Sequence, residues 1–203
     1  RNYSGGVATN VDQPYGIKVD LAATPVFNGA VVISDVQITS GANLGLGTGI
    51  DIKSNAYAKF NSTVTITVPA FVSTSNTTGI QVNNAKADFA AAVRTENHGV
   101  HIGADNSTLV FNGPVSILEA WSLGTNKTGI KARNAANISL NSTLNILGGV
   151  TYGIDISGAN TLGNFTKDLT ILDNYNGINI SSGGKGVFSG AVTVNKANLI
   201  VTN

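Results

Sequence analysis

The chain has 203 residues, of which 11% are charged, and its formal net charge at pH 7 is +1. It therefore lacks the basic stripe that binding to a phosphate backbone or an anionic membrane surface requires, and nucleic acid is disfavoured as a partner. Cysteine is absent, which excludes disulfides, thiolate metal sites and a cysteine nucleophile. No stretch approaches the roughly 18 apolar residues of a membrane span, so we expect no direct membrane insertion of this chain.

A glycine followed by Ile or Val recurs along the chain and opens a short alternating run each time. The dipeptides begin at Gly16, Gly49, Gly79, Gly99, Gly129, Gly153 and Gly177. Each is followed by an aromatic residue or a leucine, namely Phe27, Phe60, Phe89, Phe111, Leu140, Phe165 and Phe188. One unit is thus repeated about seven times, and internal repetition of this length is typical of solenoids.

Each unit contains two alternating runs separated by a polar bend. The first runs, apolar-polar-apolar, are predicted as strands at 17–19, 50–52, 80–82, 100–102, 130–132, 154–156 and 178–180. The second run follows the aromatic residue and a turn, as in 27–33, 60–66 and 188–194. Asn, Gly and Ser at these turns favour bends. No helical period runs through any unit, so helical repeats are excluded.

These features predict a right-handed parallel β-helix of about seven to eight coils, forming a single domain over 1–203. Coils stacked about 4.8 Å apart would place the Phe residues and Leu140 in one internal ladder. A β-sandwich is the main alternative, but it does not require the same Gly-Ile and Phe positions in successive strands. A leucine-rich repeat would show a fixed Leu pattern with an Asn column, which is absent.

Stacking in register predicts two outward columns after the glycines. The first contains Lys18, Asp51, Gln81, His101, Lys131, Asp155 and Asn179. The second contains Asp20, Lys53, Asn83, Gly103, Arg133, Ser157 and Ser181. Opposite charges then lie above one another at Lys18 and Asp51, at Asp20 and Lys53, and at Lys131 and Asp155. Each exposed pair contributes only about 0–1 kcal/mol, so such pairs select the register more than they stabilise the fold.

Three units have extra residues between the aromatic residue and the next glycine. These residues must leave the coils as longer loops, at Ser34–Thr48, Thr67–Thr78 and Leu118–Thr128. Loops on a rigid scaffold commonly carry recognition, and aromatic residues are favoured at contact sites. Trp121 and Phe71 fall in these loops and are our candidate ligand-binding residues. The alternative, that both side chains only cover apolar surface beneath their own loops, stays open.

The residues give no sign of a catalytic or metal site. Asp155, Asp168 and Asp173 form the densest acidic group, but their surroundings indicate solvated turns. His98 and His101 are the only histidines, and in a strand residues three apart face opposite sides, which disfavours a shared metal. Neither a Gly-x-Ser-x-Gly elbow nor a phosphate-binding loop occurs. We therefore expect no catalytic residue, no metal and no cofactor.

The Gly-Ile-x-Ile segments, as in 49–52, and the Phe-Asn-Gly/Ser segments, as in 60–66, occur in a chain without Cys or Met. This combination of repeated segments and composition resembles the passenger region of a bacterial autotransporter, a type V secreted adhesin. The resemblance implies a non-enzymatic adhesin, at the bacterial cell surface or secreted, that mediates attachment, aggregation or biofilm formation. Its partners would be a host surface protein or glycan, or neighbouring copies. It carries over no functional residues.

Two alternatives to an adhesin remain. Pectin-lyase-like enzymes share the β-helix but resemble one another in a cleft lined by Asp and Arg, often with calcium. This chain departs from that pattern, because Arg94 and Arg133 are its only internal arginines. The third hypothesis is a passive stalk that displays another binding domain. Because Arg1 follows no apolar leader and 198–202 reads as a further strand, we expect a fragment of a longer surface protein.

Overall fold

The computed structural model describes residues 15–34, 47–68, 77–119, 127–195 and 198–201. Every regular element in these ranges is a β-strand. Sheet A contains β1 (Tyr15–Val19), β4 (Gly47–Lys53), β7 (Thr77–Asn83), β10 (Val100–Asp105), β13 (Thr128–Arg133), β16 (Tyr152–Ser157), β19 (Asn176–Ser181) and β22 (Asn198–Val201). Sheet B contains β2 (Val26–Phe27), β5 (Tyr57–Phe60), β8 (Lys86–Phe89), β11 (Thr108–Phe111), β14 (Asn137–Leu140), β17 (Leu162–Phe165) and β20 (Lys185–Phe188). Sheet C contains β3 (Val31–Ser34), β6 (Val64–Thr67), β9 (Val93–Glu96), β12 (Val115–Glu119), β15 (Leu144–Gly148), β18 (Leu169–Leu172) and β21 (Val192–Asn195).

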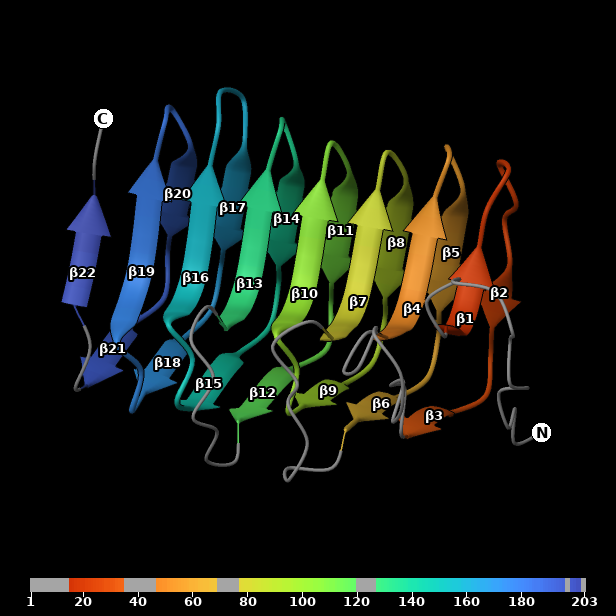
Figure 1. The fold of residues 1–203 in the computed structure, drawn as a ribbon, viewed down its shortest axis with the longest axis horizontal. Helices are drawn as coiled ribbons and strands as arrows, with labels where there is room; N and C mark the ends of the chain where they lie inside the picture. Colours follow the sequence, from red (N-terminus) through yellow and green to blue (C-terminus); the bar gives the residue numbers. More distant parts are fainter. Residues whose placement is uncertain (1–14, 35–46, 69–76, 120–126, 196–197, 202–203) are drawn as a thin grey trace, which may run out of the picture.

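The chain visits the three sheets in turn, and each strand pairs in parallel with the strand three places later in the sequence. One strand from each sheet makes a coil, and successive coils stack along the axis of the molecule (Figure 1). The predicted parallel β-solenoid is therefore confirmed. The right-handed winding and the number of coils stay predictions.

The strand register follows the predicted repeat except in one coil. Ile50 is aligned with Ile80 in sheet A, but Ile80 is aligned with Ile102 and not with Val100. The glycine position of this coil is thus occupied by His101, and the prediction that Gly99-Val100 is its repeat dipeptide is wrong. The prediction that His101 belongs to the first outward column is also wrong. Gly103 takes that place, between Gln81 and Lys131.

The interior contains the predicted aromatic ladder. Phe27, Phe60, Phe89 and Phe111 stack with ring centroids 4.7–4.8 Å apart and nearly parallel planes. Phe165 and Phe188 continue the column at 4.9 Å, and the register places Leu140 between Phe111 and Phe165. Burying each ring contributes about 1.5–3 kcal/mol, and each stacked pair about 0.5–1.5 kcal/mol more. A coil alone would leave these rings in water, so the coils stabilise one another.

Close packing between coils explains why glycine recurs before isoleucine. A Cβ atom added to Gly49 would lie 2.5 Å from Ile66 Cγ2 and 2.6 Å from the backbone oxygen of Gly79. A Cβ on Gly153 would lie 2.6 Å from the oxygen of Gly177. These distances are far shorter than ordinary van der Waals contact. The glycines are therefore required by the close approach of the next coil.

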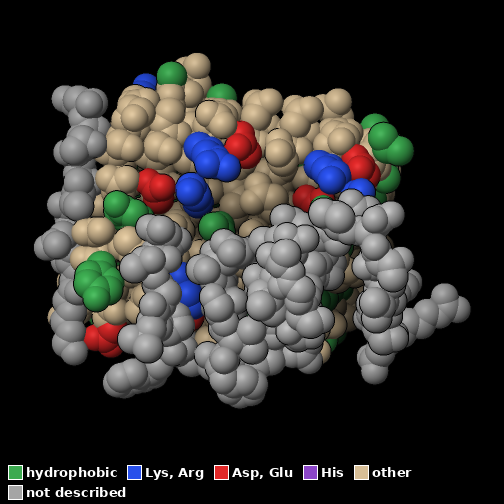
Figure 2. All heavy atoms as spheres, viewed as in Figure 1, with side chains coloured by type: hydrophobic (Ala, Val, Ile, Leu, Met, Phe, Trp, Pro, Cys, Tyr) green, Lys and Arg blue, Asp and Glu red, His purple; other side chains and the backbone are tan. Residues whose placement is uncertain are grey.

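The outer face of sheet A carries mixed charge, with positive and negative side chains next to one another (Figure 2). The predicted stacking of Lys18 on Asp51 and of Lys131 on Asp155 is confirmed by the register. The ion pairs nevertheless run partly along single strands. Lys18 Nζ lies 3.7 Å from Asp20 Oδ2. Asp155 accepts a hydrogen bond from the Asn179 amide at 2.7 Å instead of contacting Lys131.

Candidate functional site

Three long connections join strand ends at one edge of the solenoid, which we call the C-to-A edge. Residues 35–46 join β3 to β4, residues 69–76 join β6 to β7, and residues 120–126 join β12 to β13. Each therefore leads from the end of a sheet C strand to the start of a sheet A strand. The other coils make the same connection with 97–99, 149–151, 173–175 and 196–197. The strand ends thus place the long connections where the spacing predicts them.

Both candidate ligand-binding residues belong to these connections. Phe71 is part of 69–76 and Trp121 is part of 120–126. Both lie outside the described residues, so their role in binding stays a prediction. The described residues at the bases of the same connections show what holds the strand ends in place.

Five buried polar residues lie at the C-to-A edge where the short connection 97–99 runs between two of the long ones. We call this group the polar corner, and it consists of Thr95, His98, His101, Glu119 and Lys127. Their exposed fractions range from 0% to 5%. Glu119 is the last residue of β12 and Lys127 directly precedes β13, so these two residues flank 120–126.

Hydrogen bonds join four of the five side chains in a row. Lys127 Nζ donates to Glu119 Oε1 at 2.5 Å, and His101 Nε2 lies 3.1 Å from Glu119 Oε2. A carboxylate only accepts, so Nε2 carries the proton and donates it to Glu119. His101 Nδ1 lies 3.0 Å from Thr95 Oγ1 and accepts from that hydroxyl. The row runs from Thr95 through His101 and Glu119 to Lys127.

His98 contacts this row through its ring. The centroids of the two imidazoles are 5.5 Å apart and their planes are perpendicular. The expectation that His98 and His101 face opposite sides of a strand is wrong, because His98 lies in the turn before β10. Its Nε2 donates to the oxygen of Ile66 at 3.4 Å. Within the described part of the chain, its buried Nδ1 has no hydrogen-bond partner.

The polar corner forms where two positions of the repeat change together. In sheet C, Thr95 is aligned with Ile66 on one side and Ile117 on the other, so a hydroxyl replaces an apolar side chain in an inward column. In sheet A, His101 stands at the position held by Gly79 in the preceding coil. A buried hydroxyl without a partner is costly, and the imidazole supplies that partner. Sequence reasoning missed this site, although a Thr where other units have Ile was a visible signal.

Burial controls protonation in the polar corner. Burial, with a smaller contribution from the neighbouring His101, lowers the pKa of His98 to about 3. Burial also lowers the pKa of His101, against the opposing effect of its hydrogen bond to Glu119. Both imidazoles are therefore neutral at pH 7. The buried charges are those of Glu119 and Lys127, which compensate each other.

The order hydroxyl, imidazole, carboxylate is that of the catalytic triads of acyl transfer. A nucleophile must also meet its substrate, and the side chain of Thr95 is 0% exposed. The described cavity of this protein is lined by none of the polar corner residues. The row of hydrogen bonds therefore holds the edge together.

The remaining ionisable groups that the sequence singled out do not converge. Asp155 lies on β16, whereas Asp168 and Asp173 lie before and after β18. The carboxylate of Asp168 accepts a hydrogen bond from the backbone N–H of Ala191 at 3.0 Å. Among the described residues, no group of three or more His, Asp or Glu side chains is arranged to hold a metal ion.

The fold defines the chain as a parallel β-solenoid with long connections gathered on one edge. Comparison with protein-family models, with curated proteins and with solved structures finds no match for this chain. In the described ranges, no helix is long and apolar enough to cross a membrane.

Proposed function

We propose that this chain is a non-enzymatic adhesin fragment of autotransporter type, displayed on the bacterial surface or secreted. It attaches to a host surface protein or glycan, or to neighbouring copies, through the C-to-A edge. The observation that carries the proposal is the placement of all three long connections between the same two sheets of one stacked scaffold. Such an edge gives each of these connections its start and its end on a rigid support.

The interior supports a binding role for the outside of the molecule. The inward columns are filled with Phe, Ile, Leu, Val and Ala, and the interior polar side chains of the polar corner bind one another. This packing leaves the outward faces and the edges as the surfaces that meet a partner. Trp121 and Phe71, which belong to two edge connections, are the proposed contact residues.

The polar corner supports the edge as the binding surface. Glu119 and Lys127 flank 120–126, and their buried ion pair fixes the two strand ends that this connection joins. A fixed base lowers the entropy that a connection loses on binding a partner. The connection carrying Trp121 thus starts and ends at well-defined positions.

An enzyme of the pectin-lyase type is the less favoured alternative. Such a site needs arginines that face a substrate together with carboxylates. Arg133 Nε lies 3.0 Å from Asp105 Oδ2 at the outer face of sheet A. Arg94 is paired with Glu96 on sheet C. The two arginines thus belong to different sheets, and each already has a carboxylate partner.

The test measures attachment of beads coated with residues 1–203 to cultured epithelial cells and to beads carrying the same chain. Trp121→Ala, Phe71→Ala and a variant with 120–126 replaced by a Gly-Ser linker are compared with Leu21→Ala. Leu21 is a matched control because it is apolar, 85% exposed and outside the C-to-A edge. We expect the edge variants to lower attachment at least several-fold and the control to leave it unchanged.

Three results would contradict the proposal. Attachment that survives all edge variants would exclude the edge as the binding surface. A wild-type chain that attaches to neither surface would favour the passive stalk. Depolymerisation of polygalacturonate, assayed with and without calcium, would favour the enzyme.

A further inference from the structure

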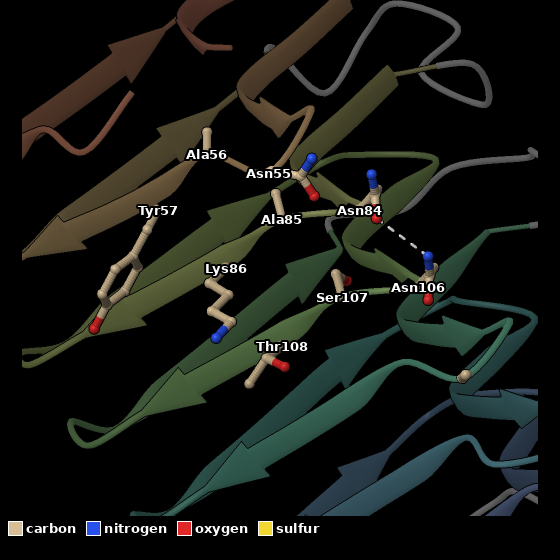
Figure 3. Close-up of a pocket in the computed structure, with 10 residues that line it drawn as sticks. Asn55, Ala56, Tyr57, Asn84, Ala85, Lys86, Asn106, Ser107 and Thr108 are labelled. Atoms are coloured by element: carbon tan, nitrogen blue, oxygen red, sulfur yellow. Dashed lines mark hydrogen bonds between the residues drawn. The ribbon is translucent and has the colours of Figure 1, made fainter. Parts of the chain in front are cut away.

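A notch lies at a different corner of the solenoid, where the chain passes from sheet A to sheet B. It has a volume of about 420 Å³ and spans the starts of β5, β8 and β11 (Figure 3). This volume is within the range of about 300–1,000 Å³ typical of small-molecule sites. The notch is separate from the C-to-A edge, so a ligand in the notch is independent of the proposed function.

The notch exists because two neighbouring turns are one residue shorter than the turns on either side. The aligned strand ends Lys53, Asn83, Asp105 and Arg133 are followed by the aligned strand starts Tyr57, Lys86, Thr108 and Asn137. Residues 54–56 and 134–136 therefore make the outer turns, and 84–85 and 106–107 the inner ones. The longer turns form the walls, where Asn55 and Ala135 line the notch.

The floor of the notch is apolar and buried. Ala56 is 1% exposed and Ala85 is 6% exposed, and both line the notch. Ser107 is also buried, and its hydroxyl donates to the backbone oxygen of Val82 at 3.1 Å. The floor is therefore close-packed and has no polar side-chain atom that needs a partner, so the groups that can bind a ligand are the exposed side chains at the two ends of the notch.

One end of the notch is lined by carboxamides (Figure 3). The Asn106 amide donates to Asn84 Oδ1 at 3.2 Å, which leaves the NH₂ group of Asn84 and Oδ1 of Asn106 facing outwards. Asn55 lies beside them on the wall. An amide pair that offers both a donor and an acceptor matches adjacent hydroxyls, because each hydroxyl can donate and accept.

The other end of the notch carries a positive charge. Figure 3 shows the Lys86 ammonium group near Thr108 and away from the carboxamides. No carboxylate is among the described residues that line the notch. The hydroxyl of Tyr57, which also lines the notch, donates a hydrogen bond to the carboxylate of Asp88. Lys86 forms no ion pair with any described residue.

We propose that the notch binds one hexuronate unit, an acidic sugar. Its carboxylate contacts Lys86, its ring spans the floor between the two ends, and two adjacent hydroxyls at the far side of the ring bind the carboxamides of Asn84 and Asn106. A carboxylate at one end and hydroxyls at the other are the groups that the two ends of the notch can recognise.

The test is a titration of the whole chain with sodium glucuronate, followed by NMR of the Asn side-chain amides. We expect the amide signals of Asn84 and Asn106 to shift, with a dissociation constant in the millimolar range. Lys86→Gln should weaken binding about tenfold, which corresponds to about 1.4 kcal/mol. Lys185→Gln is the matched control, because Lys185 occupies the same column outside the notch.

A second variant fills the notch without changing its charge. Inserting one Ser between Asn84 and Ala85 restores the three-residue turn found at 54–56, and we expect it to abolish binding. Its unfolding in urea shows whether the chain still folds; if it does not, Asn106→Ala, with an expected several-fold loss of affinity, takes its place. Glucose and acetate are the ligand controls, and each should bind at least several-fold more weakly than glucuronate.

Several results would overturn the proposal. Unshifted Asn84 and Asn106 amides at tens of millimolar glucuronate would exclude the site. Equal affinity for acetate would show that Lys86 attracts any carboxylate, and equal affinity for glucose would exclude the role of Lys86. Equal losses in Lys86→Gln and Lys185→Gln would show that surface charge alone attracts the ligand.

Discussion

The coil of β10, β11 and β12 has the same register as the coils on either side, yet it is held together differently at the C-to-A edge. In the first two coils a glycine fits beneath the next backbone, and an isoleucine fills the inward position of sheet C. Around β10, these two positions are held by His101 and by Thr95 of the coil before it. These two side chains are joined by a hydrogen bond, whereas the glycine and isoleucine of the regular coils interact by close packing alone. A repeat can thus change chemistry without changing register when both partners change together.

The largest effect should come from breaking the polar corner. Glu119→Gln removes the charge that compensates Lys127, and leaving one buried charge uncompensated costs about 3–5 kcal/mol. Glu96→Gln is the matched control, since Glu96 is paired with the exposed Arg94 and should lose only about 0–1 kcal/mol. Urea unfolding measures both. Equal losses for the two variants would mean that the corner is no more than another surface ion pair.

The regular coils should be sensitive to added volume at the glycine position. Gly49→Ala places a Cβ atom 2.5 Å from Ile66 Cγ2 and should reduce the free energy of unfolding by about 1–3 kcal/mol or more. Gly29→Ala should have little effect, because a Cβ atom added to Gly29 would meet nothing within 4 Å among the described residues. The midpoints of thermal unfolding compare the two. An unaffected Gly49→Ala chain would contradict the steric explanation of the Gly-Ile repeat.

The polar corner should make stability depend on pH. The pKa of His98 is lowered to about 3 in the fold, chiefly by burial and then by His101 and Lys127, whereas in the unfolded chain it is about 6.5. Between these values only the unfolded chain binds the proton on this side chain. The contribution of His98 to stability therefore falls as the pH is lowered below about 6.5, by at most about 1.4 kcal/mol per pH unit for this one group.

His98→Gln keeps a donor for the oxygen of Ile66 and removes this titration. Unfolding free energies measured from pH 7 to pH 4 should therefore fall less steeply in the variant, by about one proton. A variant with the same slope as the wild-type chain would show that His98 is not the group that titrates.

The smallest effect concerns the aromatic ladder. The column already accepts leucine at Leu140, so Phe89→Leu should fold and lose mainly its two stacked ring pairs, at a cost of about 1–3 kcal/mol. Chemical denaturation of Phe89→Leu beside the reverse change Leu140→Phe gives the comparison. A loss as large as that of Glu119→Gln would place the main stabilising contact in the ladder and not in the polar corner.

The sequence predicted what depends on periodicity. The Phe column, the strands after each glycine and the three long connections follow from spacing alone, because each coil repeats one steric solution. The coil of β10 differs from its prediction because Val100 and Ile102 precede Phe111 by eleven and nine residues, and the other units span the same range. Spacing therefore could not choose between them.

The polar corner and the notch could not be predicted for a further reason. Thr95, His101 and Glu119 lie in different strands, and only the fold brings them together. The notch depends on a one-residue difference between turns, which is visible only when the strand ends are aligned. Both features arise where single units depart from the repeat, and periodicity predicts only what the units have in common.

A double-mutant cycle of Thr95→Ile and His101→Gly tests most directly whether the two positions changed together, because the double variant restores the residues that regular coils carry. Each single change leaves a buried polar group unpaired, at about 1–3 kcal/mol. We expect the double variant, measured by urea unfolding, to lose less stability than the two single losses together, with a coupling energy of about 1–3 kcal/mol. Losses that add within about 0.5 kcal/mol would show that the two positions changed independently and would contradict the polar pairing inferred for this coil.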